Sequence, residues 1–155
     1  MATTEPTLGT VLNREQVSDR KTGPVKAGVI LGVGLVYQDG ANGWDNATSQ
    51  SGEVCYWNET VIDNSAGVLG DKVGTFFGTG ALVVGYSEGI IAVNARCKNG
   101  TVANGFVTNT VALVADVLLT CAIYKGHPLE RTGNETLPTA SADTETNCVF
   151  EIVRS

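Results

Sequence analysis

The segment Gly67–Ala95 consists of short apolar runs interrupted by glycines. Within it, Leu, Val and Tyr at positions 82, 84 and 86 alternate with Val, Gly and Ser at positions 83, 85 and 87, and a second apolar run follows at residues 90–93. Alternation with a period of two is typical of strands in a folded sheet. The segment therefore predicts two or three strands, with turns at Gly70–Asp71 and at residues 78–80.

Other parts of the chain have the same strand-like character. Lys26–Tyr37 is an apolar run broken by glycines, which suits a bent strand or a pair of strands. Glu53–Ile62 is expected to form a strand or hairpin, and Cys148–Val153 alternates as a closing strand. The dipeptide Asn99–Gly100 predicts a tight hairpin. The chain is therefore predicted to be mainly β.

Residues 109–121 have a different period. Asn109, Ala112, Asp116 and Thr120 are three or four positions apart, and most positions between them are apolar. This spacing predicts one helix near 109–121. The valine content of the segment also suits a strand, so both states stay open here.

Aromatic residues stand out in two places. Tyr56 and Trp57 are adjacent in a strand-like segment, whereas Trp44 lies in a turn-rich stretch, residues 39–46. Aromatic side chains of this kind bury on the order of 150–250 Å² each. We expect one of the adjacent pair to anchor the core and the other to form part of an interface. Trp44 is expected either to fold back or to contact a neighbour.

Composition divides the chain at about residue 24. Residues 1–24 contain few large apolar side chains and several charges, so they are predicted to form an extended N-terminal arm. Such an arm either stays loose or becomes ordered on a partner. Residues 25–155 are predicted to form a single β-rich domain, because a chain of 155 residues commonly folds as one domain.

Charge excludes some classes of partner. The net charge is −6 and no Lys/Arg cluster is present, so we expect no nucleic-acid partner. The first residues lack the basic and apolar regions of a secretory signal, which predicts cytoplasmic synthesis. No apolar run is long enough to cross a membrane, and a soluble chain is expected. Since only 17% of residues are charged, we expect sister subunits or a larger assembly to cover part of the surface.

The cysteines argue against a metal site. The chain has one histidine and no Cys-x-x-Cys pair, and its cysteines are far apart: Cys55, Cys97, Cys121 and Cys148. We therefore expect buried thiols and no bound metal. A secreted, glycosylated binding domain with disulfides stays open as an alternative, because several positions match the Asn-x-Thr sequon: Asn46, Asn58, Asn99 and Asn134.

One string resembles a catalytic motif. Gly85–Gly89 fits the Gly-x-Ser-x-Gly pattern of serine hydrolases, and Ser87, Asp116 and His127 occur in the hydrolase order. In that motif a helix follows the serine, but here a β-branched run follows it. We therefore expect a strand after Ser87, His127 beyond hydrogen-bonding distance, and no catalytic residues; a Ser87-dependent hydrolase is the minor alternative.

No cofactor motif is present either. Gly32 and Gly34 are followed by Tyr37 where a dinucleotide fingerprint needs glycine, and no helical pattern follows them. We expect neither a cofactor nor an enzymatic activity.

The order of these segments resembles a known family. The entry strand Ala27–Gly32, a glycine-rich middle and the run Ala81–Val93 are similar to the small head-decoration (cement) proteins of tailed bacteriophages, over roughly residues 10 to 95. The resemblance implies a compact β-barrel or β-tulip-like domain on the outer capsid surface of the virion. It also implies the major capsid protein as partner and a homo-oligomer, with a trimer favoured. The alternative is another β-rich virion component, a tail-tube or head-fibre subunit.

Overall fold

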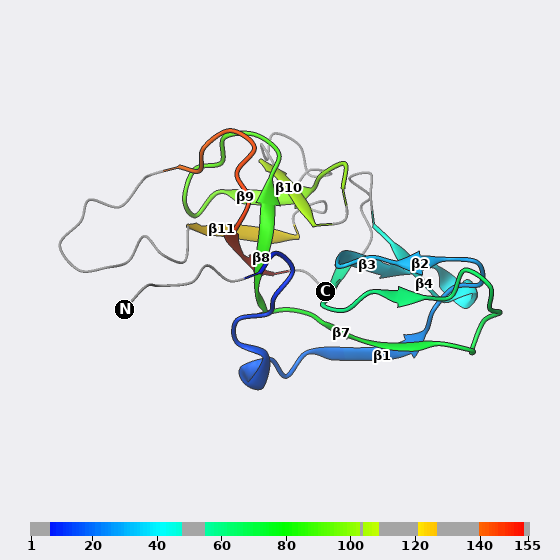
Figure 1. Cartoon of the computed structure of the whole chain (residues 1–155). Helices are drawn as coiled ribbons and strands as arrows, with labels where there is room; N and C mark the ends of the chain where they lie inside the picture. The colour runs from blue at the N-terminus through cyan, green and yellow to red at the C-terminus, as the bar shows by residue number, and fades with distance from the viewer. Residues whose placement is uncertain (1–6, 48–54, 103, 109–120, 127–139, 154–155) are drawn as a thin grey trace.

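The computed structural model describes residues 7–47, 55–102, 104–108, 121–126 and 140–153. Strands make up 47% of the structure, and within the described residues helices are limited to the 3₁₀ turns η1 (Arg14–Gln16) and η2 (Gly40–Asn42). Figure 1 shows the strands in two groups, a barrel on one side and a sheet on the other. The predicted mainly β class is confirmed.

The sheet has five strands in the order β1-β7-β5-β3-β4: β1 (Arg20–Pro24), β7 (Val73–Phe77), β5 (Cys55–Asn58), β3 (Gly34–Gln38) and β4 (Trp44–Asn46). All of its neighbours are antiparallel. Directly after β1, Val25 forms a parallel bridge with Trp44, and the N–H of Lys26 donates to the carbonyl of Trp44 at 3.0 Å. The outer strands of the sheet therefore meet, and the sheet curls on itself.

The second group is a closed barrel with the order β10-β8-β12-β11-β9: β10 (Gly105–Thr108), β8 (Leu82–Ser87), β12 (Cys148–Ile152), β11 (Ala122–Gly126) and β9 (Arg96–Asn99). β8 runs parallel to β10, and the other pairs are antiparallel. The chain thus contains a β-barrel, as the resemblance implies. A short antiparallel ribbon, β2 (Ile30–Leu31) with β6 (Ile62–Asp63), lies beside the sheet.

Side chains of the sheet point alternately to two cores, since successive strand residues face opposite sides. In β3, Leu35 and Val36 belong to different cores, and in β7 the same holds for Phe77 and Phe76. The smaller of these two cores we call the sheet core: Val25, Leu31, Val36, Trp44, Tyr56 and Phe76. Leu31 of the ribbon belongs to this core, and Ile62 packs against it.

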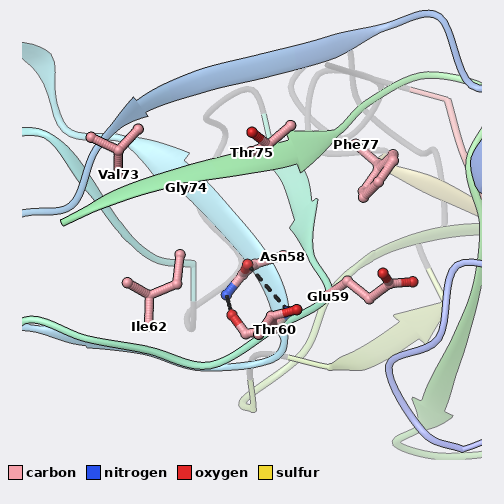
Figure 2. Close-up of a pocket in the computed structure, with 8 residues that line it drawn as sticks. All are labelled: Asn58, Glu59, Thr60, Ile62, Val73, Gly74, Thr75 and Phe77. Atoms are coloured by element: carbon pink, nitrogen blue, oxygen red, sulfur yellow. Dashed lines mark hydrogen bonds between the residues drawn. The ribbon is translucent and has the colours of Figure 1, made fainter.

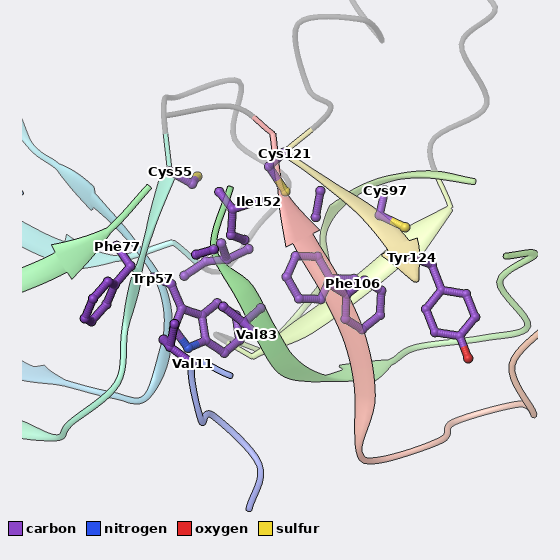
Figure 3. Packing of buried hydrophobic residues seen from close by; sticks show 14 of the residues in the cluster. Val11, Cys55, Trp57, Phe77, Val83, Cys97, Phe106, Cys121, Tyr124 and Ile152 are labelled. Carbon is purple, nitrogen blue, oxygen red and sulfur yellow. The ribbon is translucent and has the colours of Figure 1, made fainter. Parts of the chain in front are cut away.

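The larger cluster, which we call the barrel core, fills the barrel and the contact between barrel and sheet (Figure 3). Its centre is a row of aromatic rings: Trp57 of β5 stacks on Phe106 at 5.9 Å between centroids, and Phe106 stacks on Phe150 at 4.1 Å. Because Trp57 comes from the sheet and the other two rings from the barrel, this row joins the two groups of strands into one body.

The N-terminal segment belongs to the folded body, which corrects the prediction of an extended arm for its described part. Val11 is 4% exposed and bridges Val83 of β8, and Val17 is equally buried. Residues 20–24 are β1, paired with β7 along its whole length. The composition argument missed this segment because a few buried valines and a backbone ladder are enough to hold it. Residues 1–6 lie outside the described part.

Of Tyr56 and Trp57, one was predicted to anchor the core and the other to form part of an interface; only the first part is right. Trp57 is fully buried, and its indole N–H donates to the carbonyl of Gly9 at 2.9 Å. Tyr56 is also buried, at 5% exposure, because it faces the sheet core on the opposite side of the sheet. Neither ring forms an exposed interface. Trp44 folds back into the sheet core, with its ring centroid 4.6 Å from that of Phe76.

Several local predictions can be compared with the structure. The chain turns at Gly70 and Gly80, both at positive φ, as expected. The hairpin at Asn99–Gly100 is present between β9 and β10, but residues 100–104 connect its strands instead of a two-residue turn. Residues 109–120, on which the helix prediction rests, lie outside the described part.

Candidate functional site

Ser87, the candidate nucleophile, is the last residue of β8 and is fully buried. Its Oγ accepts a hydrogen bond from the N–H of Glu145 at 2.9 Å and lies 3.2 Å from the carbonyl oxygen of Glu145. The hydroxyl therefore ties the segment before β12 to β8. A serine nucleophile instead needs an exposed Oγ on a strand-to-helix turn.

In the described part of the chain, Ser87 lacks the strand-to-helix turn of a serine hydrolase. Glu88 and Gly89 make a bend, and the expected strand over residues 90–93 is reduced to one bridge between Ala92 and Ala140, so that prediction was too long. No helix occurs between β8 and β9 in the structure. The other members of the hydrolase string, Asp116 and His127, lie outside the described residues.

The cysteines are buried thiols, as expected, and all of them pack in the barrel core. Burial raises the pKa of the Cys97 thiol to about 12, so this group stays protonated near neutral pH. Protonated, buried thiols are poor nucleophiles and poor metal ligands. In the part of the chain that the structure describes, no three His, Cys, Asp or Glu side chains come together as metal ligands.

An ion cluster in the sheet half has a structural role. The Nζ of Lys26 lies 2.7 Å from Oδ2 of Asp39 and 3.2 Å from Oδ2 of Asp45. The hydrogen bond from Lys26 holds the pKa of Asp39 below its ordinary value, and both carboxylates raise the pKa of Lys26. The cluster fixes the η2 loop to the chain after β1. None of its groups is left over for chemistry on a ligand.

A pocket of about 320 Å³ opens between β7 and the segment that follows β5 (Figure 2). It exists because the β5–β7 ladder contains a single pair, Trp57 with Phe77, beyond which the two strands diverge. The pocket is lined on one side by β7 and on the other by the β5–β6 connection: Asn58, Glu59, Thr60, Ile62, Val73, Gly74, Thr75 and Phe77.

The polar side chains of the β5–β6 connection already have partners within the chain. The amide of Asn58 donates to the carbonyls of Thr60 and Gly32, each at 2.8 Å. Oε2 of Glu59 accepts the N–H of Val11 at 2.8 Å, and its other oxygen pairs with Arg14. These bonds stabilise the wall of the pocket.

Gly74 lines this pocket and lies within β7. A Cβ at this position would lie 2.6 Å from Cδ1 of Ile62 and 2.5 Å from the Phe76 ring. Gly85 has the same role in the barrel, where a Cβ would lie 2.9 Å from both Phe106 and Phe150. Both glycines make room for neighbouring side chains, so they are packing residues.

Five large apolar residues of β7, of the β2–β6 ribbon and of the segments next to the ribbon are exposed. We call them the sheet-end patch: Ile30, Val61, Val68, Leu69 and Val73, which are 44–65% exposed. Val68 is held beside the ribbon, because its N–H is bonded to Asp71 and its carbonyl to Asn64. The segment between β6 and β7 that carries Val68 and Leu69 forms the end of the molecule remote from the barrel (Figure 1).

Sequence reasoning named no residue of this pocket as a site. The pocket comes from a strand pair that stops after one bridge, and no motif encodes such an interruption. One signal was present in the sequence: the strand-like pattern ends at the polar stretch Asn58–Thr60. There the chain turns away from β7.

In the described part of the chain, no helix has the length and apolar character needed to cross a membrane. Comparison with protein-family models, with curated proteins and with solved structures found no match to the chain.

Proposed function

We propose that this chain is a structural virion protein, a decoration or cement protein that binds the outer surface of a bacteriophage capsid and stabilises it. Its partner is the major capsid protein, and its own copies form a homo-oligomer, for which a trimer is favoured. The observation that carries the proposal is the sheet-end patch, an exposed apolar surface at the end of a body with two packed cores. Apolar surface of this kind is typical of protein contacts.

The composition of the body supports the same proposal. Only 17% of its residues are charged, and the candidate nucleophile and the thiols are buried. A protein that stabilises a shell needs a rigid body and a contact surface. The packing of residues 7–24 changes one detail: β1 is paired with β7, so this segment is part of the folded body and not a loose arm that could wrap a partner. The capsid contact is assigned to the sheet-end patch instead.

The test is cosedimentation of the purified chain with empty capsids, assembled from the major capsid protein of the virus that encodes the chain. We expect binding that saturates at a fixed ratio to the capsid subunit. Val68→Asp should weaken it by about tenfold, because a charge would be desolvated at an apolar contact. The matched control is Ile90→Asp: Ile90 is 67% exposed, close to the 65% of Val68, but lies in the barrel half.

Several outcomes would contradict the proposal. It fails if the chain stays in the supernatant at saturating capsid, or if both aspartate variants bind like the wild type. Rings or filaments formed by the chain alone would favour a tail-tube or head-fibre subunit, and negative-stain imaging detects them. Glycan mass and disulfides in the intact protein would favour a secreted binding domain.

A further inference from the structure

The backbone of β7 has two edges, and only one is fully paired. The N–H of Gly78 donates to the carbonyl of Asp19 at 2.7 Å, and the carbonyl of Lys72 accepts from the N–H of Val25 at 2.9 Å. Even-numbered residues of β7 therefore turn their backbone groups toward β1, because the direction alternates along a strand. Odd-numbered residues turn theirs toward β5.

On the β5 side, Phe77 is paired with Trp57, and the ladder then stops. The N–H and C=O groups of Val73 and Thr75 therefore face the pocket, and no strand in the described part of the chain pairs with them there. They form an open edge of about 7 Å between these two residues, from a rise of about 3.3 Å per residue. Unpaired strand edges are templates for another strand.

We infer that this edge is a binding site for an extended segment of another protein, which adds to β7 as a strand. Its main-chain groups would pair with Val73 and Thr75, and one of its side chains would enter the pocket. That side chain is expected to be apolar and uncharged, because Ile62, Val73 and Phe77 line the pocket and its carboxylate, Glu59, is already bonded to Val11 and Arg14. This is recognition by strand addition, with main-chain pairing and a side-chain pocket.

A second copy of the chain is a poorer occupant than another protein. The barrel is closed and offers no strand edge. The outer strands of the sheet meet at the bridge between Val25 and Trp44, and β1 ends in Pro24, which has no N–H to donate. The strands of the ribbon are only two residues long each. The free edge that a second copy does have, the outer side of β1 at Arg20 and Thr22, belongs to a folded sheet. A folded sheet is too thick to enter the gap between β7 and the β5–β6 connection, whereas a single extended segment is not.

The inference does not rest on the capsid proposal, because strand pairing depends on the backbone of β7 and not on the identity of the assembly. A chain that binds peptides at β7 but ignores capsids would overturn the capsid proposal alone. A chain that binds capsids but no peptide at β7 would overturn this one alone.

A matched pair of variants at Thr75 isolates the edge. Thr75→Pro removes the N–H that faces the pocket and leaves the pairing with β1 intact, because the Thr75 N–H points away from β1. Thr75→Val keeps that N–H. Both variants lose the contact between the hydroxyls of Thr22 and Thr75 at 3.1 Å, so this loss cancels in the comparison. Thermal unfolding of the two proteins shows whether both fold.

The probe is a yeast-displayed library of short random peptides, selected against the wild-type chain and then synthesised for fluorescence anisotropy. We expect the selected peptides to alternate polar and apolar residues. They should bind Thr75→Pro about tenfold more weakly than wild type and Thr75→Val within about twofold. Amide exchange at Val73 and Thr75 should slow on binding, and a merely structural effect of the variants would not produce this.

The inference fails if the selection enriches no peptide, if peptides bind Thr75→Pro as tightly as wild type, or if amide protection appears away from β7. Sedimentation velocity of the wild-type chain tests whether a second copy of the chain occupies this edge instead. Dimers that Thr75→Pro abolishes would identify a second copy at this edge and overturn the assignment to another protein. If Thr75→Pro fails to fold, Val73→Pro replaces it and the same outcomes apply, with Val73→Thr as its control.

Discussion

The barrel and the five-stranded sheet are built from strands of similar length, yet they differ in how completely the edges of their strands are paired. In the barrel every strand has a neighbour on both sides, and its interior contains a stack of rings from Phe106 and Phe150. In the sheet, β5 and β7 share one pair and then separate, leaving a pocket and two residues of β7 that are unpaired on the β5 side. Closure therefore stabilises one half, whereas the other half keeps backbone groups available for a partner.

Exposed apolar side chains follow the same division. The sheet-end patch belongs to the sheet and its ribbon, whereas only Leu12, Ile90 and Val102 are comparably exposed around the barrel among the described residues. The contact surface that we propose therefore lies on the sheet half of the molecule. The two halves are not independent, because Trp57 of the sheet stacks on Phe106 of the barrel.

The strongest test of this division is truncation of one ring in each half. Phe106→Ala should lower the free energy of unfolding by about 3–5 kcal/mol, because Phe106 is fully buried between Trp57 and Phe150. Its loss should speed amide exchange in both halves. Phe76→Ala, equally buried in the sheet core, should speed exchange in the sheet alone. Denaturant unfolding and hydrogen exchange measure these effects; identical exchange patterns would show that the halves are a single cooperative unit.

A smaller effect is expected from filling the two packing glycines. Gly85→Ala should cost about 1–3 kcal/mol, because the new methyl group meets two buried rings of the barrel. Gly74→Ala should cost at least as much, because its methyl group would lie 2.5 Å from the fully buried Phe76 ring and 2.6 Å from Cδ1 of Ile62. Denaturant midpoints of the two variants give the comparison. A smaller cost for Gly74→Ala would mean that the sheet core yields to the added methyl group more easily than the barrel core.

The smallest expected effect is the pH dependence of stability that Asp39, in the sheet half, gives to the fold. Because the pKa of Asp39 is held below its ordinary 3.8, Asp39 stabilises the fold above that pH, and this contribution is lost as the pH falls through the lowered value. Asp39→Asn should therefore lower the unfolding temperature at pH 7, and the difference from wild type should shrink below about pH 4. The control is Glu151→Gln in the barrel, whose partner Lys125 is 3.7 Å away. A difference for Asp39→Asn that is independent of pH would contradict this assignment.

The period-two pattern was enough to predict a mainly β chain, and it located β7, β8 and β12 closely. This pattern could not predict the order of the strands in each sheet, because pairs such as Val11 with Val83 join segments far apart in the sequence. The same limit hid the burial of residues 7–24. The pocket could not be predicted either, since it depends on where a ladder stops rather than on which residues line it. The alternation over residues 82–87 correctly predicted Ser87 as a strand residue, whereas the β-branched run after it forms only the bridge at Ala92.

The segment Thr7–Pro24 touches both halves: Val11 pairs with β8 of the barrel, and β1 pairs with β7 of the sheet. During synthesis this segment leaves the ribosome well before residues 73–84, with which it pairs. Arg20 pairs with Phe77, so more than 50 further residues must be made before this pairing can form. Until then the valines of the segment stay exposed to solvent. Pairing over such separations slows folding and prolongs the time in which apolar groups meet other chains. Residues 7–24 thus join the two halves of the molecule late in folding, although they are made before the strands with which they pair.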